Sequence, residues 1–413
     1  MGKTLVVIGT LDTKGLEIAY LVDRIKKLSA GNIQILVVDS GMSGEPSNGI
    51  KPDIGRGEVA RAGGESIEKI ISAKSRGEAI TLMEKGLTKT IYTLYENGQC
   101  DGVVSLAGAS GGFLACAAMK ALPIGVPKLI ATPLASGPRT FSTFVGTKDI
   151  MIMHSVIDIL GVNSISKIIY NQLAGAAVGA TNSATTKMSK NKNAIGVTML
   201  GNTTEGVMHL KSFLEKLDYE VIVFHSSGIG GKAMEQFARD GFFCGVIDYT
   251  TNEVFEDIVG GLQRGAGPER LSVIGKLGLP QVIVPGCVDF FDQGPIDNIP
   301  EKWKNKKLYS HSPSFTLVRL TKDEMSNLGR IFAEKLNNSK GPTVVVFPLK
   351  GLSIPNCPGG VFEDKEADMA FLNTLRKNLR NDIKILEIDA HINDKFFAEE
   401  VASTFIKIKE GRW

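Results

Sequence analysis

The chain alternates short runs of β-branched and aliphatic residues with longer stretches whose apolar residues recur every three or four positions. Buried parallel strands give continuous apolar runs, whereas helices that cover a sheet give the longer spacing. The sequence predicts strands at residues 4–9, 33–39, 101–106, 127–132, 194–200, 219–224, 244–248, 281–285, 343–348 and 383–388. This alternation predicts an α/β fold of mainly parallel sheets with helices on both faces, and ligands at the carboxyl ends of the strands.

Residues 181–193 lose the apolar periodicity and consist mostly of small polar and basic residues, a composition typical of an exposed linker. A chain of 413 residues is also too long for one ordinary core. We therefore expect two Rossmann-like domains, residues 1–180 and 194–413, joined by this linker. Each half begins with a strand, a small polar turn and a helix.

The first of these turns is the most informative segment. The strand at residues 4–9 leads into a helix whose first backbone N–H groups have no partner within the helix. Asp12 or Thr13 can cap them, but Lys14 places a cation where the helix dipole favours a negative charge. A bound phosphate would remove that mismatch. A capped turn with a solvated lysine is the alternative.

Two further features of the first half are typical of anion binding. Residues 107–112 form a glycine-rich turn between strand and helix, and Ser110 adds a hydroxyl. Ser75 and Glu78 have the spacing of a capping box, which places Arg76 in the first turn of a helix that runs to about Asn97. Arg76 either points into water or binds an anion. We expect Lys14, Arg76 and Ser110 to face one side of the same sheet.

The second half carries a glycine turn, Gly228–Ala233, that fits the dinucleotide fingerprint, with Asp248 about 20 residues later. In dinucleotide-binding domains the fingerprint follows the first strand, whereas this turn follows the second strand of its half, which counts against the reading. Polar residues at the other strand ends predict a substrate site or second anion site, although many such residues only cap helices. The candidates for that site are Asn202, Thr203, Thr204, Gly228, Gly230, Gly231 and Ser353. The catalytic candidates are His225, Asp248 and Lys350.

Composition narrows the class of protein. The 47 basic and 44 acidic residues nearly balance. The chain also lacks the stripe of basic residues interleaved with aromatic ones that would predict nucleic-acid binding. Five cysteines without a C-x-x-C pair predict neither a disulfide framework nor a zinc site, and fit a cytoplasmic protein. Five scattered histidines give no case for a metal site formed by the protein alone. No apolar run is long enough for a membrane span.

Taken together, residues 9–14, 107–112, 198–204, 225–231 and 348–353 make the chain resemble a family of largely uncharacterised bacterial proteins. That family is related to the N-terminal ATP-binding domain of the tomato mosaic virus resistance protein. The resemblance implies two Rossmann-like subdomains, ATP with Mg²⁺ held by the first, and a homo-oligomer. Carried over by position, it implies ATP contacts at Asp12, Thr13, Lys14, Met42, Arg76, Ala109, Ser110, Gly111 and Gly112. Ala109, Phe113 and Asn356 depart from the family pattern.

Three hypotheses follow. The first is an ATP-dependent enzyme, of the phosphoryl-transfer or ligase type, that acts on a small metabolite in a cleft between the domains. The alternative is a non-catalytic nucleotide-binding protein with a regulatory or interaction role. A second alternative is an NAD-dependent oxidoreductase that uses Gly228, Gly230 and Asp248.

Overall fold

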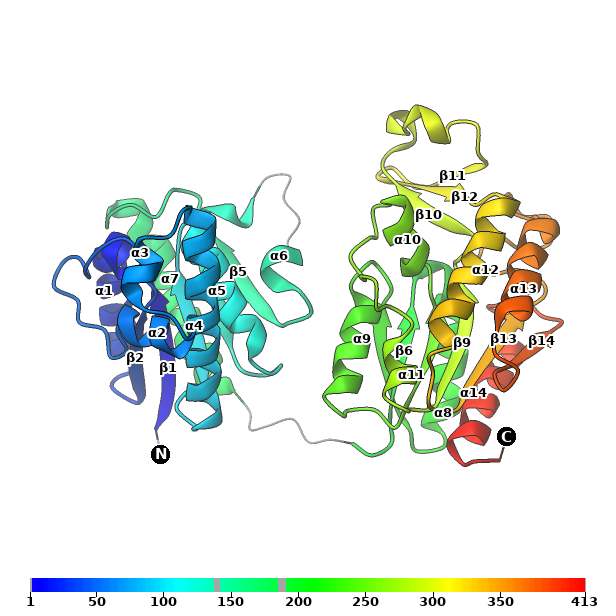
Figure 1. The fold of residues 1–413 in the computed structure, drawn as a ribbon, viewed down its shortest axis with the longest axis horizontal. Coiled ribbons are helices and arrows are strands. Elements are labelled where there is room, and N and C mark those ends of the chain that lie inside the picture. The colour runs from blue at the N-terminus through cyan, green and yellow to red at the C-terminus, as the bar shows by residue number, and fades with distance from the viewer. Residues whose placement is uncertain (1, 137–141, 185–190, 413) are drawn as a thin grey trace. The chain divides into compact units, whose positions relative to one another are not determined.

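A computed structural model describes residues 2–136, 142–184 and 191–412 of the chain (Figure 1). The chain divides into two compact units, Met1–Met188 and Ser189–Trp413, and each has its own sheet and hydrophobic core. Both units are α/β, with parallel sheets flanked by helices.

The first unit contains a five-stranded parallel sheet in the order β2-β1-β3-β4-β5. Its strands are β1 (Lys3–Gly9), β2 (Ile33–Asp39), β3 (Gly102–Leu106), β4 (Lys128–Thr132) and β5 (Ile150–His154). Strand order reverses between β1 and β3, which is the point where open α/β sheets bind ligands. Gly9 is in register with Asp39, so the turns after β1 and β2 begin level with each other.

Helices cover both faces of this sheet, which explains the continuous apolar run of β1. Leu5 and Val7 pack against α1 (Leu11–Leu28) and α7 (Ser164–Ser183). Val6 and Ile8 belong to the core on the opposite face, with α2 (Arg56–Ala62), α4 (Arg76–Glu96) and α5 (Ala109–Ala121). The shorter elements are α3 (Ile67–Ile71), η1 (Pro133–Ala135) and α6 (Ser142–Val145).

The second unit contains a six-stranded parallel sheet in the order β14-β13-β9-β8-β6-β7. Its strands are β6 (Ala194–Met199), β7 (Glu220–His225), β8 (Gly245–Thr250), β9 (Gln281–Gly286), β13 (Thr343–Pro348) and β14 (Lys384–Ile388). An antiparallel sheet of β10 (Phe290–Gln293), β12 (Phe315–Arg319) and β11 (Leu308–Ser312) is inserted after β9.

The helices of the second unit also lie on both faces of its main sheet. One face carries α8 (Thr204–Glu215) and α14 (Lys395–Lys409). The other carries α9 (Gly230–Arg239), α10 (Glu253–Val259), α11 (Val273–Lys276), α12 (Lys322–Leu336) and α13 (Lys365–Asn378). Among its described residues the unit also has the short 3-10 helices η2 (Gly201–Thr203), η3 (Ile296–Asn298) and η4 (Glu301–Trp303).

All ten predicted strands are present, with ends that differ from the prediction by no more than two residues. The prediction lacked β5 and the three strands of the inserted sheet. It also placed the start of the linker too early, since α7 continues through Ser183. Residues 185–190 of the expected linker lie outside the described residues. Within the described ranges, no helix is both long and apolar enough to cross a bilayer.

Candidate functional site

A small hollow opens at the carboxyl edge of the first unit's sheet, where strand order reverses. The turns after β1, β2 and β3 and the first residue of α4 line it. Its lining residues are Thr10, Asp12, Thr13, Lys14, Met42, Ser43, Arg76, Gly108, Ala109, Ser110 and Gly111. Its volume of about 80 Å³ is far below the roughly 300–1,000 Å³ of pockets that enclose whole ligands. The hollow is therefore the size of a phosphate group and not of a nucleotide.

The turn after β1 is held by carboxylates from two directions. Asp39, at the end of β2, accepts a hydrogen bond from the Leu11 N–H at 3.1 Å and so caps α1. The Asp12 carboxylate instead accepts from the backbone N–H groups of Met42 at 3.0 Å and Ser43 at 2.8 Å. The prediction that Asp12 or Thr13 caps α1 is therefore wrong. Asp12 fixes the loop after β2 against the hollow, which is how Met42 becomes part of the lining.

Lys14 lies at a break in α1. Its backbone angles, φ −127° and ψ 20°, are not helical, so a single turn from Leu11 to Thr13 precedes the main helix. The Lys14 ammonium group donates to the carbonyl of Ile159, in the segment before α7. This contact holds a partly buried cation at the edge of the hollow.

Arg76 reaches the same hollow from α4. The Ser75 side chain caps that helix by accepting from the Glu78 N–H at 3.1 Å. Glu78 reaches back to the N–H of Lys74 and not to that of Ser75, so the expected capping box is shifted by one residue. Arg76 is thereby fixed in the first turn, and its Nε donates to the Ser110 hydroxyl at 3.1 Å. Arg76 and Ser110 are 34 residues apart in sequence and meet in space.

The start of α5 forms the opposite wall of the hollow. Its N-cap is Gly108, which offers no side chain to the first N–H groups, and the first turn contains no acidic residue. A Cβ on Gly111 would lie 3.2 Å from that of Ala107 and 3.3 Å from the Thr10 methyl, so glycine permits the close packing here. Gly112 is buried one residue further along and does not line the hollow. The other eight residues that the resemblance assigned to ATP all do.

Burial changes the protonation of Asp39, the carboxylate that caps the turn after β1. Burial raises the pKa of Asp39 above its ordinary value, the nearby Asp12 charge raises it further, and N–H groups of Gly41 and Leu11 oppose the rise. Among the residues that the structure describes, no group of three or more His, Cys, Asp or Glu side chains could hold a metal ion.

The glycine turn of the second unit is filled by the protein itself. The Glu253 carboxylate accepts from the N–H of Gly228 at 2.9 Å and from the N–H of Gly231 at 3.1 Å. Arg270 Nε also donates to it at 2.8 Å, and Glu253 is fully buried. Two N–H groups and a guanidinium are donors that a pyrophosphate would use. An internal carboxylate already occupies them.

Asp248 belongs to the same buried network. Both its oxygens accept from the Arg270 guanidinium, and Oδ1 also accepts from the Thr198 hydroxyl at 2.7 Å. The carboxylate is therefore turned away from solvent, where a ribose would have to bind. In the dinucleotide reading, the N–H groups of Gly228 and Gly231 and the Asp248 carboxylate would bind the ligand, but all three already have partners within the protein.

The three catalytic candidates do not converge. His225 ends β7 and Lys350 follows β13, and these strands are four spacings apart in the sheet, about 19 Å. Both side chains are exposed, and Lys350 pairs with Asp389 at 3.0 Å. No single small substrate could contact both of them together with the buried Asp248.

Most of the other second-unit candidates are also engaged internally. The hydroxyl of Thr203 lies 2.8 Å from that of Thr250, and Ser353 donates to Asp289 at 2.8 Å. Asn202 is buried and its carbonyl accepts from Asn393, whereas Thr204 is exposed. A Cβ on Gly230 would lie 1.8 Å from the His225 carbonyl oxygen, so this glycine serves the tight turn.

Sequence reasoning missed Asp39 and Arg270. It treated Glu253 only as one of the polar residues at strand ends, and did not foresee that this carboxylate fills the glycine turn. Asp39 is the last residue of a predicted strand, so its position at the carboxyl edge could have been found from the sequence. Nothing in the local sequence indicates the buried pairing of Glu253 and Arg270, because their partners lie 17 to 25 positions away.

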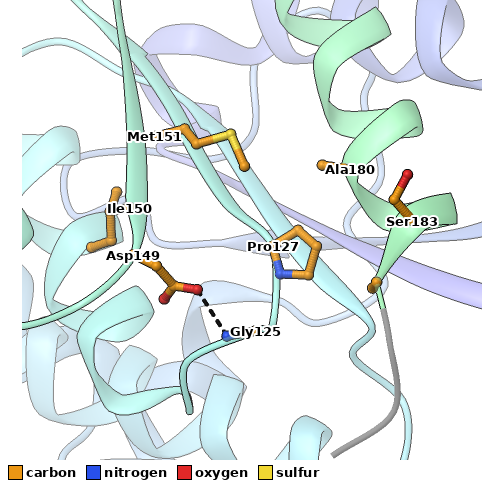
Figure 2. A pocket seen from close by; sticks show the side chains of 8 residues that line it. Gly125, Pro127, Asp149, Ile150, Met151, Ala180 and Ser183 are labelled. Atoms are coloured by element: carbon orange, nitrogen blue, oxygen red, sulfur yellow. Dashed lines mark hydrogen bonds between the residues drawn. The ribbon is translucent and has the colours of Figure 1, made fainter. Parts of the chain in front are cut away.

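The first unit has a second pocket, away from the carboxyl edge of the sheet that carries the hollow. Its volume is about 470 Å³, and it is lined at the amino ends of β4 and β5 and the end of α7 (Figure 2). Asp149, its one acidic lining residue, accepts from the Gly125 N–H at 2.8 Å and pairs with buried Lys128 at 2.6 Å. The acid is thus used internally, and none of the sequence candidates lies in this pocket.

Comparisons with known proteins match both units. Family models of the uncharacterised protein family UPF0261 match the chain, the N-terminal domain over residues 3–186 and the C-terminal domain over residues 192–409. A UPF0261 protein of Clostridium tetani is 40% identical over 411 residues, covering 99% of this chain and 100% of that protein. The ToMV resistance protein Tm-1(GCR237) of Solanum lycopersicum is 33% identical over 97% of this chain, which spans only 55% of the tomato protein.

Similarity to solved structures is weak. A UDP-GlcNAc 2-epimerase from Neisseria meningitidis is 11% identical, with 68% of this chain and 82% of that chain covered and a TM-score of 0.23. At that score the likeness supports no statement about activity.

Proposed function

We propose a function for this chain, which belongs to the uncharacterised protein family UPF0261. Its first unit binds ATP together with Mg²⁺ at the hollow described above. The observation that carries the proposal is the hydrogen bond from Arg76 to Ser110, 3.1 Å long. It places a guanidinium group against the uncapped first turn of α5, at the point where strand order reverses.

The chemistry of the lining suits a phosphate. N–H groups at a helix start carry partial positive charge and lack partners within the helix. The first turn of α5 contributes no carboxylate that would compete for them. Lys14 adds a compact ammonium charge and Arg76 a planar guanidinium, which binds phosphate oxygens in pairs. These groups neutralise charge on the terminal phosphates while the rest of the nucleotide stays outside the hollow.

The residues present fit Mg²⁺ only as part of a metal–nucleotide complex. The lining offers one carboxylate, Asp12, and the hydroxyls of Thr10, Thr13, Ser43 and Ser110. Mg²⁺ in nucleotide sites is commonly bound by one or two carboxylates, phosphate oxygens and water. Asp12 is the residue that would contact the ion or its water shell. The ion would supply further neutralisation of the phosphate charge.

Two roles for the bound nucleotide remain to be separated. The first is an ATP-dependent enzyme of the phosphoryl-transfer or ligase type that acts on a small metabolite. The second is a regulatory or interaction protein that binds ATP without turnover. The internal pairing of Asp248 with Arg270, and the wide separation of His225 from Lys350, favour this second role.

A thermal-shift panel tests the binding proposal. ATP, ADP and NAD are added separately to the full chain, each with and without Mg²⁺. We expect Mg-ATP to raise the melting temperature, because a ligand that binds only the folded state stabilises it by RT ln(1 + [L]/Kd). Stabilisation by NAD but not by ATP would contradict the proposal.

Turnover is tested separately by measuring ATP consumption in the presence of small carboxylates and other metabolites. Consumption that depends on one metabolite would identify the enzyme role. Binding of ATP without consumption under any condition would identify the regulatory role.

A further inference from the structure

An exposed aromatic ring lies one helical turn beyond the phosphate-sized hollow. Phe113 is in α5, four residues after Ala109, which lines the hollow, and 39% of its surface is exposed. Residues four apart lie on the same face of a helix, separated by about one 5.4 Å turn. Phe113 therefore shares a helix face with the wall of the hollow.

The direction of helical side chains brings the ring closer still. Long side chains in an α-helix point back toward its N-terminus and cover the preceding turn. The turn before Phe113 is the one that carries Ala109, Ser110 and Gly111. By this rule the Phe113 ring covers the turn that lines the hollow, and Phe113 itself lies just outside the lining.

One face of the Phe113 ring packs against another aromatic ring. Phe144, in α6, stacks on Phe113 with centroids 5.0 Å apart and an interplanar angle of 18°. Phe144 is itself 3% exposed and is part of the core that lies beneath α5. One face of Phe113 is therefore packed against a fixed partner, while a large part of the ring stays accessible.

We infer that Phe113 is the platform on which the base of the bound nucleotide stacks, so that this site selects nucleotides over free polyphosphate. The inference rests on the proposed function, because it takes the hollow as the phosphate site. A hollow of about 80 Å³ cannot also enclose a purine, so the base must bind on the surface beside it. An accessible aromatic ring one turn away offers the π-face on which any nucleobase can stack.

Binding of two ligands that differ in the base tests the inference. The affinities of Mg-ATP and of inorganic tripolyphosphate with Mg²⁺ are measured by calorimetry on the full chain. In the wild-type protein we expect ATP to bind more tightly. In Phe113→Ala the ATP affinity should fall about 5- to 150-fold, the range for one stacked base, while that of tripolyphosphate stays unchanged. Phe113→Tyr, which keeps the ring, should retain the preference for ATP.

Phe396→Ala is the matched control, because it removes a ring that is 60% exposed on α14 of the second unit. Equal losses for both ligands in Phe113→Ala, or no loss for either, would overturn the inference and leave the phosphate site standing. Failure of both ligands to bind the wild-type protein would overturn the proposed function, and the inference with it.

Discussion

Arg76 and Arg270 carry the same charge in opposite surroundings. Arg76 is exposed and donates to a single hydroxyl, that of Ser110. Arg270 is 1% exposed and is surrounded by the carboxylates of Asp248, Glu253 and Glu235. A guanidinium enclosed by three acids has no capacity left for a ligand, whereas one beside an uncapped helix start does. The two side chains therefore predict different kinds of mutational effect.

Removing either cation at the hollow should weaken ATP binding without unfolding the chain. Loss of a charged hydrogen bond costs about 1.5–3 kcal/mol, so we expect Arg76→Ala and Lys14→Ala each to raise the Kd for Mg-ATP roughly 10- to 100-fold. Calorimetry measures the affinity, and the melting temperature without ligand checks the fold. Unchanged affinity in both variants would place the nucleotide elsewhere.

Removing Arg270 should instead destabilise the protein. Arg270→Met leaves buried carboxylates without their counter-charge, and breaking a buried ion pair in this way costs about 3–5 kcal/mol. Denaturant unfolding of the variant measures the loss. Arg239→Met is the control, since the Arg239 pair with Glu269 is largely exposed, with side-chain exposures of 35% and 61%. A loss no larger than that of the control would show that the buried network contributes little.

How far single residues could be predicted depends on the range of their contacts. Lys14, Arg76 and Ser110 were placed at one sheet edge from strand ends and helix caps, which are local patterns. The role of Asp12 was misjudged, because its partners Met42 and Ser43 follow a different strand. Glu253 could not be foreseen as the filler of the second glycine turn, since that role depends on how α10 packs.

Strands with long apolar runs rich in β-branched residues were recognisable in the sequence, and four strands without such a run were not. The run Ile-Met-Ile-Met of β5 is only four residues long, and methionine is also a good helix former, so its periodicity is ambiguous. In β11, Tyr309 and His311 alternate with serines and are partly exposed, which gives no continuous apolar run. The inserted sheet is therefore invisible to a search for buried parallel strands.

That inserted sheet is joined to α10 by two buried acids. Glu256 of α10 accepts from the backbone N–H of Asp292 in β10 at 2.6 Å, and both residues are almost fully buried. Burial raises the pKa of Glu256 to about 9 and that of Asp292 to about 6, and the neighbouring Asp292 adds to the rise for Glu256. The pair therefore keeps a proton at neutral pH.

The buried acid pair predicts that stability falls as the pH rises. The folded state holds a proton that the unfolded chain releases near pH 4–5, so the contribution is complete below that range and is lost as the pH approaches 9. One such proton contributes up to about 1.4 kcal/mol per pH unit. Urea unfolding at pH 6 and pH 9 measures the difference.

Asp292→Asn should flatten this pH dependence, because the neutral amide removes the like charge and can donate to Glu256. We expect the variant to be more stable than the wild-type protein at pH 9. Asp297→Asn, at an exposed position nearby in sequence, is the control and should keep the wild-type slope. The same slope in both variants would exclude the acid pair as its source.

At the scale of the whole molecule, the two units apply one architecture in two ways. Both are parallel sheets with helices on both faces, and both have a glycine-rich turn between a strand and a helix. In the first unit the turn lines a hollow, and in the second it encloses Glu253. The sequence predicted two similar units but not this difference, which arises from one side chain that sits 25 residues after Gly228.

All residues that line the hollow come from positions 10 to 111, so the first unit should bind ATP by itself. We expect a fragment of residues 1–188 to bind Mg-ATP with a Kd within about twofold of that of the full chain, since no lining contact is removed. Calorimetry on this fragment, on residues 191–413 and on the full chain measures the three affinities. A folded first fragment without affinity, judged by circular dichroism, would show that the second unit contributes to the site.

The Glu253 carboxylate has one more consequence, for the lifetime of the protein in a cell. This carboxylate belongs to the chain itself, so the stability that it gives the second unit does not depend on the concentration of any ligand. If the first unit binds ATP as proposed, its stability would instead rise and fall with the ATP concentration, and its rate of proteolysis would change with it. On that proposal, a fall in the ATP concentration would expose the first unit to proteases before the second.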